Sequence, residues 1–143
     1  MQTSFTDKQL TDKDNKSSES ILRKCVHCGM CNATCPTFCV NGEELEGPRG
    51  RIYLIKDMLE NKKPANKKVV KHIDSCLSCY SCMTTCPSGV NYMHLIDHGR
   101  NYVEETYKRP FFDRLFRNVL SFVLPRPKVF LVLAYLTKLI KPF

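Results

Sequence analysis

The chain has 143 residues, a hydrophobic content of 43% and a formal net charge of +8. This length suits one domain with a modest core. Nine cysteines are confined to two blocks, which indicates two binding sites and disfavours a scattered disulfide framework. The first residues show neither a basic start with an apolar run nor a small-residue cleavage site. We therefore expect a cytoplasmic protein, in which the thiols stay reduced.

The positive charge also raises the possibility of nucleic-acid binding. Five of the lysines lie in the run "NKKPANKKVVKH", from Asn61 to His72. The run contains Pro64 and no interleaved aromatic residues, so a solvated linker is the better interpretation and no nucleic-acid partner is expected.

The chain begins with a polar segment, residues 1–20, that is rich in Ser, Asp, Lys and Asn and predicts a flexible arm. A folded domain is expected over residues 21–108. Within it, Gly47-Pro48 predicts the start of a helix, because proline is favoured in the first helical turn. Apolar residues then recur at helical spacing on one face, which should pack inward: Ile52, Ile55 and Leu59.

A second, short helix is predicted from about Val69 to Ser75, directly before the second cysteine block. After that block, Asn91 is a plausible N-cap for a further helix. No segment shows sustained alternation of apolar and polar residues. The sequence therefore predicts an all-α domain with two cysteine loops held between helices.

The last segment, residues 109–143, is predicted to be a helical apolar tail. Its unbroken apolar run from Val129 to Leu136 is shorter than the roughly 20 residues that a membrane-spanning helix needs. A buried helix is the first expectation for this run. An interfacial helix with basic residues near lipid headgroups is the alternative.

Each cysteine block has the form C-x2-C-x2-C-x3-C-P. Zinc sites usually combine two separated C-x2-C hairpins, whereas three cysteines at successive two-residue gaps can bind three corners of a cubane cluster. Two complete copies, 51 residues apart, predict two [4Fe-4S] clusters in preference to zinc or disulfides. The predicted ligands are Cys25, Cys28, Cys31 and Cys35 before Pro36, and Cys76, Cys79, Cys82 and Cys86 before Pro87.

The fourth cysteine of each block has a different predicted role, because in two-cluster ferredoxins it binds the other cluster. Cluster 1 would be bound by Cys25, Cys28, Cys31 and Cys86, and cluster 2 by Cys76, Cys79, Cys82 and Cys35. Four cysteines per cluster leave no vacant iron for substrate. The predicted role is therefore electron transfer between two close clusters, with no catalytic residues in this chain.

The four histidines show no spacing that predicts a metal site. His27 lies within the first cysteine loop but aligns with Ser78 in the second, so tuning of the cluster is a minor alternative to a packing role. The other three, His72, His94 and His98, are expected at the surface or in packing contacts.

Two other features near the motifs leave alternatives open. Cys39 aligns with Val90 in the second copy, which predicts a buried free thiol, with a reserve ligand as the alternative. The stretch "GPRGR", from Gly47 to Arg51, places two arginines in a first helical turn, where the macrodipole disfavours them. A negatively charged cluster or an acidic partner would offset this cost, and two solvated arginines are the alternative.

Three stretches together resemble the amino-terminal part of the iron–sulfur subunit of glycolate oxidase (glycolate dehydrogenase). They are "CVHCGMCNATCPTF", "GEELEGPRGRIYLIKDMLE" and "CLSCYSCMTTCPSGVNYMHLIDHGR", and the resemblance covers about residues 20–128. Related iron–sulfur subunits serve lactate utilisation and anaerobic glycerol-3-phosphate dehydrogenase. Subunits of this family continue into a carboxy-terminal region with CCG repeats. This sequence contains no CCG, and its tail is expected to lead towards that region.

The resemblance implies an α-helical ferredoxin domain with two [4Fe-4S] clusters on the eight motif cysteines. It also implies a membrane-associated complex, and a peripheral position on the inner face of the membrane is the expectation for this chain. Flavin subunits would oxidise glycolate to glyoxylate, and this non-catalytic subunit would relay the electrons towards a quinone or another acceptor. The alternatives are a subunit of lactate or glycerol-3-phosphate dehydrogenase, and a free-standing dicluster ferredoxin.

Overall fold

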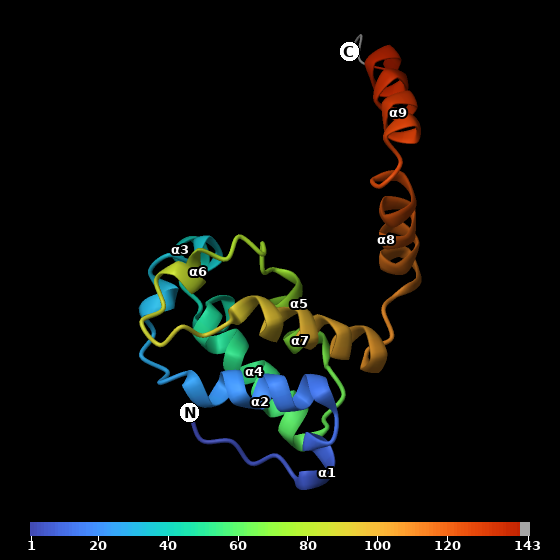
Figure 1. The fold of residues 1–143 in the computed structure, drawn as a ribbon. Coiled ribbons are helices and arrows are strands. Elements are labelled where there is room, and N and C mark those ends of the chain that lie inside the picture. The colour runs from blue at the N-terminus through green and yellow to red at the C-terminus, as the bar shows by residue number, and fades with distance from the viewer. Residues whose placement is uncertain (141–143) are drawn as a thin grey trace. The chain divides into compact units, whose positions relative to one another are not determined.

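The computed structural model describes the backbone of residues 1–140 and the side chains of residues 1–136. This part of the chain is helical and contains no strand, which confirms the predicted all-α fold (Figure 1). It divides into two units, the first from Met1 to Tyr107 and the second from Lys108 onward. The helices of the first unit are α1 (Asp7–Leu10), α2 (Lys13–Lys24), α3 (Pro36–Asn41), α4 (Pro48–Asn61), α5 (Lys67–Asp74), α6 (Ser81–Thr84) and α7 (Tyr92–Thr106), with 3₁₀ turns at Met30–Asn32 and Glu44–Glu46.

The predicted helix starts agree with the structure. Helix α4 begins at Pro48 after the N-cap Gly47. Helix α5 covers most of the second predicted helix. At the start of α7, the side chain of Asn91 accepts a hydrogen bond from the backbone N–H of His94, at 3.2 Å, and so satisfies one of the unpaired donors of the first turn.

The core of the first unit lies between α2, α4, α5 and α7. Each of these helices contributes apolar side chains that are almost completely removed from water: Leu22 from α2, Ile52, Ile55 and Leu59 from α4, Ile73 from α5, and Leu95, Ile96 and Val103 from α7. Helices α4 and α7 approach closely at Gly99, where a Cβ atom would lie 2.8 Å from Cγ1 of Ile55. The predicted apolar face of α4 is therefore confirmed as part of the core.

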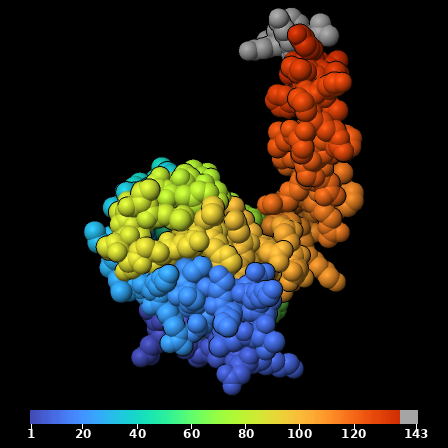
Figure 2. Space-filling view, in the orientation of Figure 1, coloured from blue at the N-terminus to red at the C-terminus, as the bar shows by residue number. Residues whose placement is uncertain are grey.

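Residues 1–20 differ from the expected flexible arm. They contain α1 and most of α2, and Figure 2 shows this segment as part of the continuous surface of the first unit. The side chain of Gln9 is buried and donates hydrogen bonds to the carbonyls of Leu59 (2.9 Å) and Glu60 (3.0 Å). Ser18 is fully buried and shares a hydrogen bond of 2.7 Å with Nδ1 of His98. The polar composition was misleading because these polar groups bond to distant parts of the chain.

The second unit contains α8 (Phe111–Val123) and α9 (Pro127–Ile140). In the described part of the apolar run, Phe130, Leu131 and Tyr135 are at least half exposed, so the expected buried helix is wrong for these side chains. Residues 129–136 of α9 are all apolar, and two short helices cannot cover so much apolar surface. No single described helix has the length and hydropathy of a membrane span; α8 and residues 127–136 meet that criterion only as a pair, with a bend of 112°.

Gly50 offers a test of the packing of α4 against the 3₁₀ turn at Glu44–Glu46. A Cβ atom there would lie 2.3 Å from the backbone oxygen of Glu44 and 2.7 Å from Cα of Leu45. Gly50→Ala should therefore destabilise the protein by about 1–3 kcal/mol, although alanine is favoured over glycine within a helix by about 1 kcal/mol. Thermal unfolding would measure this change. Lys67→Ala, on the exposed side of α5, is the control and should change stability little; an unchanged melting temperature for Gly50→Ala would contradict the close contact.

Candidate metal centres

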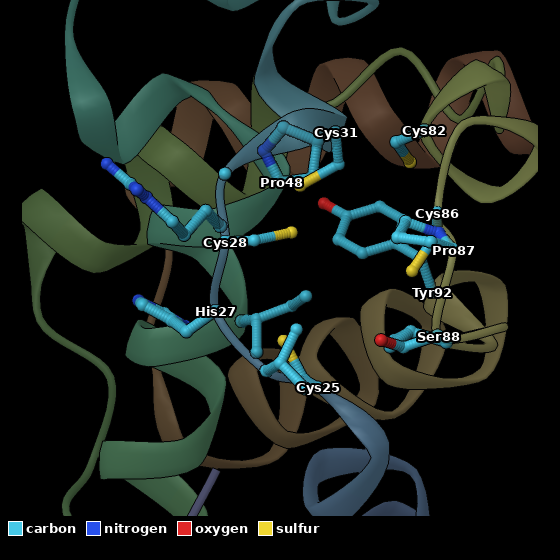
Figure 3. Close-up of a pocket in the computed structure, with 15 residues that line it drawn as sticks. Cys25, His27, Cys28, Cys31, Pro48, Cys82, Cys86, Pro87, Ser88 and Tyr92 are labelled. Atoms are coloured by element: carbon cyan, nitrogen blue, oxygen red, sulfur yellow. The ribbon is translucent and has the colours of Figure 1, made fainter.

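Five of the eight motif cysteines line a first cavity. Figure 3 shows Cys25, Cys28, Cys31 and Cys86 around one space, so that three of these cysteines come from the first block and one from the second. Cys82 also lines this cavity. The remaining walls are mainly apolar and include Pro48, Pro87 and Tyr92.

A second cavity contains the other cysteines. It is lined by Cys76, Cys79 and Cys82 from the second block and by Cys35 from the first. The structure thus brings together the two groups of four that crossed ligation requires, with Cys82 bordering both cavities. We call the first cavity site 1 and the second cavity site 2.

The sequence repeat is also a repeat of backbone conformation. In the first block, His27 and Gly29 have positive φ angles of 60° and 84°. The residues 51 positions later, Ser78 and Tyr80, have φ angles of 53° and 56°. Left-handed residues on both sides of the second cysteine reverse the chain direction locally, so that successive cysteines can face one centre. For the three residues other than glycine this conformation costs about 1–2 kcal/mol each.

The two copies diverge after the proline, and this explains the position of Cys39. Pro36 is the first residue of α3, whereas Pro87 is followed by a turn at Gly89, with φ of 59°. Cys39 therefore lies on α3 and is exposed, while the aligned Val90 is buried, with a relative exposure of 5%. The expected buried thiol is wrong, because the 51-residue alignment holds only as far as the proline.

Burial opposes ionisation of the clustered thiols. It raises the pKa of Cys31 to about 11, with a further contribution from the nearby charge of Cys25. Burial likewise raises the pKa of Cys82 to about 12. Four sulfurs around an apolar cavity can all be thiolates only if cations neutralise them, and iron provides that charge. The donor set of each site therefore fits a [4Fe-4S] cluster, which supplies one-electron redox chemistry when bound.

Arg51 lies beside site 2 and is 1% exposed, so the alternative of a solvated arginine is wrong for this residue. Its Nη1 is 3.8 Å from Sγ of Cys35. Its Nη2 donates to Oε2 of Glu46 at 3.0 Å, and its Nε donates to the carbonyl of His72 at 2.6 Å. Arg49, by contrast, is partly exposed and forms an ion pair with Glu44.

His72 belongs to the same buried network, which sequence reasoning missed. It is 1% exposed, and its Nδ1 is 2.8 Å from Oε1 of Glu46. Burial alone would raise the pKa of Glu46. Hydrogen bonds from Ser75 and His72 and the charge of Arg51 together have a larger, opposite effect, so the net shift of the pKa is downward. A buried Glu46 carboxylate is thus held ionised next to Arg51. Glu46 and His72 are 26 positions apart in the sequence, so no local sequence signal indicates this contact.

Two residues of α7, Tyr92 and Arg100, also support site 2. Arg100 donates to Oγ of Ser78 and to the carbonyl oxygen of Cys76, both at 2.7 Å, and so attaches the second cysteine loop to α7. The hydroxyl of Tyr92 donates to Sγ of Cys76 at 3.7 Å. The spacing of eight residues, which places both side chains on one face of a helix, is the signal that could have identified them.

The comparison with protein families defines the class of protein. Residues 21–90 match the family "4Fe-4S dicluster domain". Together with the two four-cysteine sites, this match shows that these residues form a helical dicluster domain and that its cofactors are two [4Fe-4S] clusters.

The predicted resemblance to glycolate oxidase iron–sulfur subunits is confirmed. The chain is 49% identical over all of its 143 residues to the "Glycolate oxidase iron-sulfur subunit" of Escherichia coli K12, and it spans 35% of that protein. It is 32% identical over 117 residues to the "Probable glycolate oxidase iron-sulfur subunit" of Bacillus subtilis, of which 26% is covered.

A more distant similarity links the chain to a third protein. It is 27% identical over 84 residues to the mitochondrial succinate dehydrogenase iron–sulfur subunit of Candida glabrata, and 33% of that subunit is covered. The chain therefore spans about a third or less of each of these relatives. No solved structure shows a significant match.

The assignment of ligands to the two sites stays a prediction, and pairs of substitutions test it. Cys86→Ser should alter the same EPR signal of the reduced protein as Cys28→Ser, because both residues line site 1. Cys35→Ser should alter the other signal, the one changed by Cys79→Ser. Cys39→Ser is the control and should leave both signals intact. If Cys86→Ser instead matched Cys79→Ser, ligation within each block would replace the crossed scheme.

Proposed function

We propose that this chain is the electron-transferring iron–sulfur part of a glycolate oxidase complex. It would accept electrons from a flavin-containing subunit and pass them towards a quinone or another acceptor. The names of the two bacterial relatives and the dicluster family match support this role. The observation that carries it is the common wall of sites 1 and 2, which both include Pro48, Cys82 and Tyr92.

The common wall suits transfer of single electrons between the sites. Oxidation of glycolate to glyoxylate releases two electrons and two protons, and two clusters can hold one electron each. Four cysteines at each site leave no open position at which a substrate could bind. The residues of this chain therefore hold the clusters close together, while oxidation of the substrate is assigned to another subunit.

Reduction by substrate would test this proposal. The chain should be prepared without oxygen, together with the flavin subunits of a glycolate oxidase, and contain about eight iron and eight sulfide per chain. Glycolate should then bleach the cluster absorbance and produce the EPR signals that dithionite produces. The Cys28→Ser/Cys79→Ser variant is the control and should lose these signals.

Several outcomes would contradict the proposal. Zinc without sulfide would exclude an electron-transfer role. Bleaching by lactate or glycerol 3-phosphate but not by glycolate, each with its own dehydrogenase subunits, would assign the chain to a different dehydrogenase. Intact clusters without any stable association with flavin subunits would favour a free-standing ferredoxin.

We further propose that the second unit attaches the complex to the cytoplasmic face of a membrane. Helix α8 exposes large apolar side chains, among them Phe112 (82%) and Phe116 (63%). From Lys108 to Leu136, Asp113 is the one acidic residue, against six lysines and arginines. Exposed aromatic residues next to basic ones are typical of helices that lie in the interface of an anionic membrane.

Vesicle binding would test this attachment. The protein should co-sediment with vesicles of phosphatidylcholine and phosphatidylglycerol, and less so with phosphatidylcholine alone or at high salt. Phe112→Asp/Phe116→Asp should reduce binding at least about tenfold, because it removes two apolar anchors and adds negative charge. Val40→Asp, at an 84% exposed position of the first unit, is the control and should bind normally. Equal binding by the Phe variant would contradict a membrane contact through α8.

A further inference from the structure

The sulfurs of the two sites differ in the side chains that bond to them. At site 2, the guanidinium of Arg51 faces Cys35 at 3.8 Å, and the hydroxyl of Tyr92 faces Cys76 at 3.7 Å. A third donor, the hydroxyl of Ser81, lies 3.7 Å from Sγ of Cys79. Three of the four sulfurs of site 2 therefore have a side-chain donor.

Site 1 has no equivalent set of donors. Within the described part of the chain, no side-chain donor is within bonding distance of Cys25, Cys28, Cys31 or Cys86. The one side-chain polar contact found for these sulfurs among the described residues is between Cys31 and Oδ1 of Asn32, at 4.0 Å, and an amide oxygen can only accept a hydrogen bond. A thiolate at Cys31 gains nothing from it.

The nearby arginines differ in the same direction. Arg51 is buried, so little water screens its effect on the sulfur of Cys35. Its partner Glu46 bonds to Nη2, while Nη1 is directed at Cys35, so the positive end of this ion pair faces the cluster ligand. Arg49, near Gly29 in the first loop, is partly exposed and paired with the exposed Glu44, so solvent weakens its field.

Solvent exposure does not offset this difference. Each site has one exposed cysteine, Cys28 in site 1 and Cys79 in site 2. Hydrogen bonds to sulfur and net local charge are main determinants of the reduction potential of an iron–sulfur cluster, because reduction adds negative charge that donors stabilise. Among the residues that the structure describes, side-chain donors are found at site 2 only, and such donors favour a higher reduction potential.

We propose that Arg51 and Tyr92 raise the reduction potential of the cluster in site 2 above that of the cluster in site 1. The first electron that enters the domain then resides on site 2 at equilibrium, and site 1 is reduced second. Arg51 and Tyr92 are positioning residues for electron transfer, since they act on the cluster ligands and touch no substrate. This inference rests on the proposed function only in requiring that both sites hold [4Fe-4S] clusters.

A potentiometric titration followed by EPR tests this order, with Tyr92→Phe as the main variant. This substitution keeps the ring in the common wall and removes only the hydroxyl. It should decrease the equilibrium constant for reduction of the higher-potential cluster at least about threefold, which lowers that reduction potential. The lower of the two potentials should stay unchanged. Tyr53→Phe, at an exposed position of α4, is the matched control and should move neither potential.

A second variant tests Arg51 without leaving a buried charge unpaired. Arg51→Gln/Glu46→Gln removes both members of the ion pair and should lower the same potential by about tenfold in the equilibrium constant, or about 59 mV for a one-electron couple. Arg49→Gln is the control at site 1 and should shift neither potential by as much. Arg51→Lys should not keep the reduction potential of the unmodified protein, because lysine lacks the planar fork that reaches Cys35 and Glu46 together.

The outcomes separate this inference from the proposed function. A shift of the lower potential by Tyr92→Phe, or of neither potential, would overturn the inference while both clusters remain present. Two indistinguishable potentials in the unmodified protein would also overturn it. Absence of iron and sulfide would instead overturn the proposed function, before any potential is measured.

Discussion

Eight cysteine sulfurs must lie close together within one small helical unit, and this requirement shapes the rest of the structure. Burial keeps thiols such as Cys31 and Cys82 protonated in the absence of metal, since four adjacent thiolates in an apolar cavity would repel one another. Iron relieves this repulsion only in part, because a [4Fe-4S] core with four thiolates remains negatively charged. The surrounding helices must therefore provide positive groups as well as shape. The buried position of Arg51 on α4 meets this need at Cys35.

The pairing of the two blocks also determines the topology of the first unit. Cys35 lies in site 2 and Cys86 in site 1, so neither site can form without residues from both halves of the sequence. Helix α4 lies between the blocks in the chain and contributes Ile52 and Ile55 to the core as well as Arg51 to site 2. Binding of the clusters is thus coupled to folding of the core, as in other proteins whose metal ligands are far apart in sequence.

Sequence reasoning succeeded where a short, local pattern determines the structure. The cysteine spacing, the Gly47-Pro48 helix start and the Asn91 N-cap all depend on residues within a few positions of one another. It failed where distant groups decide. Gln9 is buried because carbonyls some 50 residues away accept its hydrogen bonds, and nothing near Gln9 in the sequence indicates them.

The same distinction applies to the surroundings of the clusters. The position of Arg49 and Arg51 in a first helical turn indicated that they need a negative neighbour. It did not indicate which of the two is buried, because that depends on how α4 packs against α5. The network of Arg51, Glu46 and His72 joins three separate elements and leaves no local pattern. The 51-residue repeat is reproduced in the backbone turns of the two loops, but it misled at Cys39, because the two copies lead into different helices after their prolines.

The repeat also bears on the direction of electron flow. Two copies of one motif would by themselves form two equivalent sites, and each has one solvent-exposed cysteine, Cys28 or Cys79, through which electrons could enter or leave. Exposure therefore gives no preferred direction. Apart from Ser81 within the second block, the donors that distinguish the two sites come from outside the repeat, from Arg51 on α4 and Tyr92 at the start of α7. An electron that reaches either site is then drawn to site 2, and the surrounding helices, more than the cysteine loops, determine where it rests.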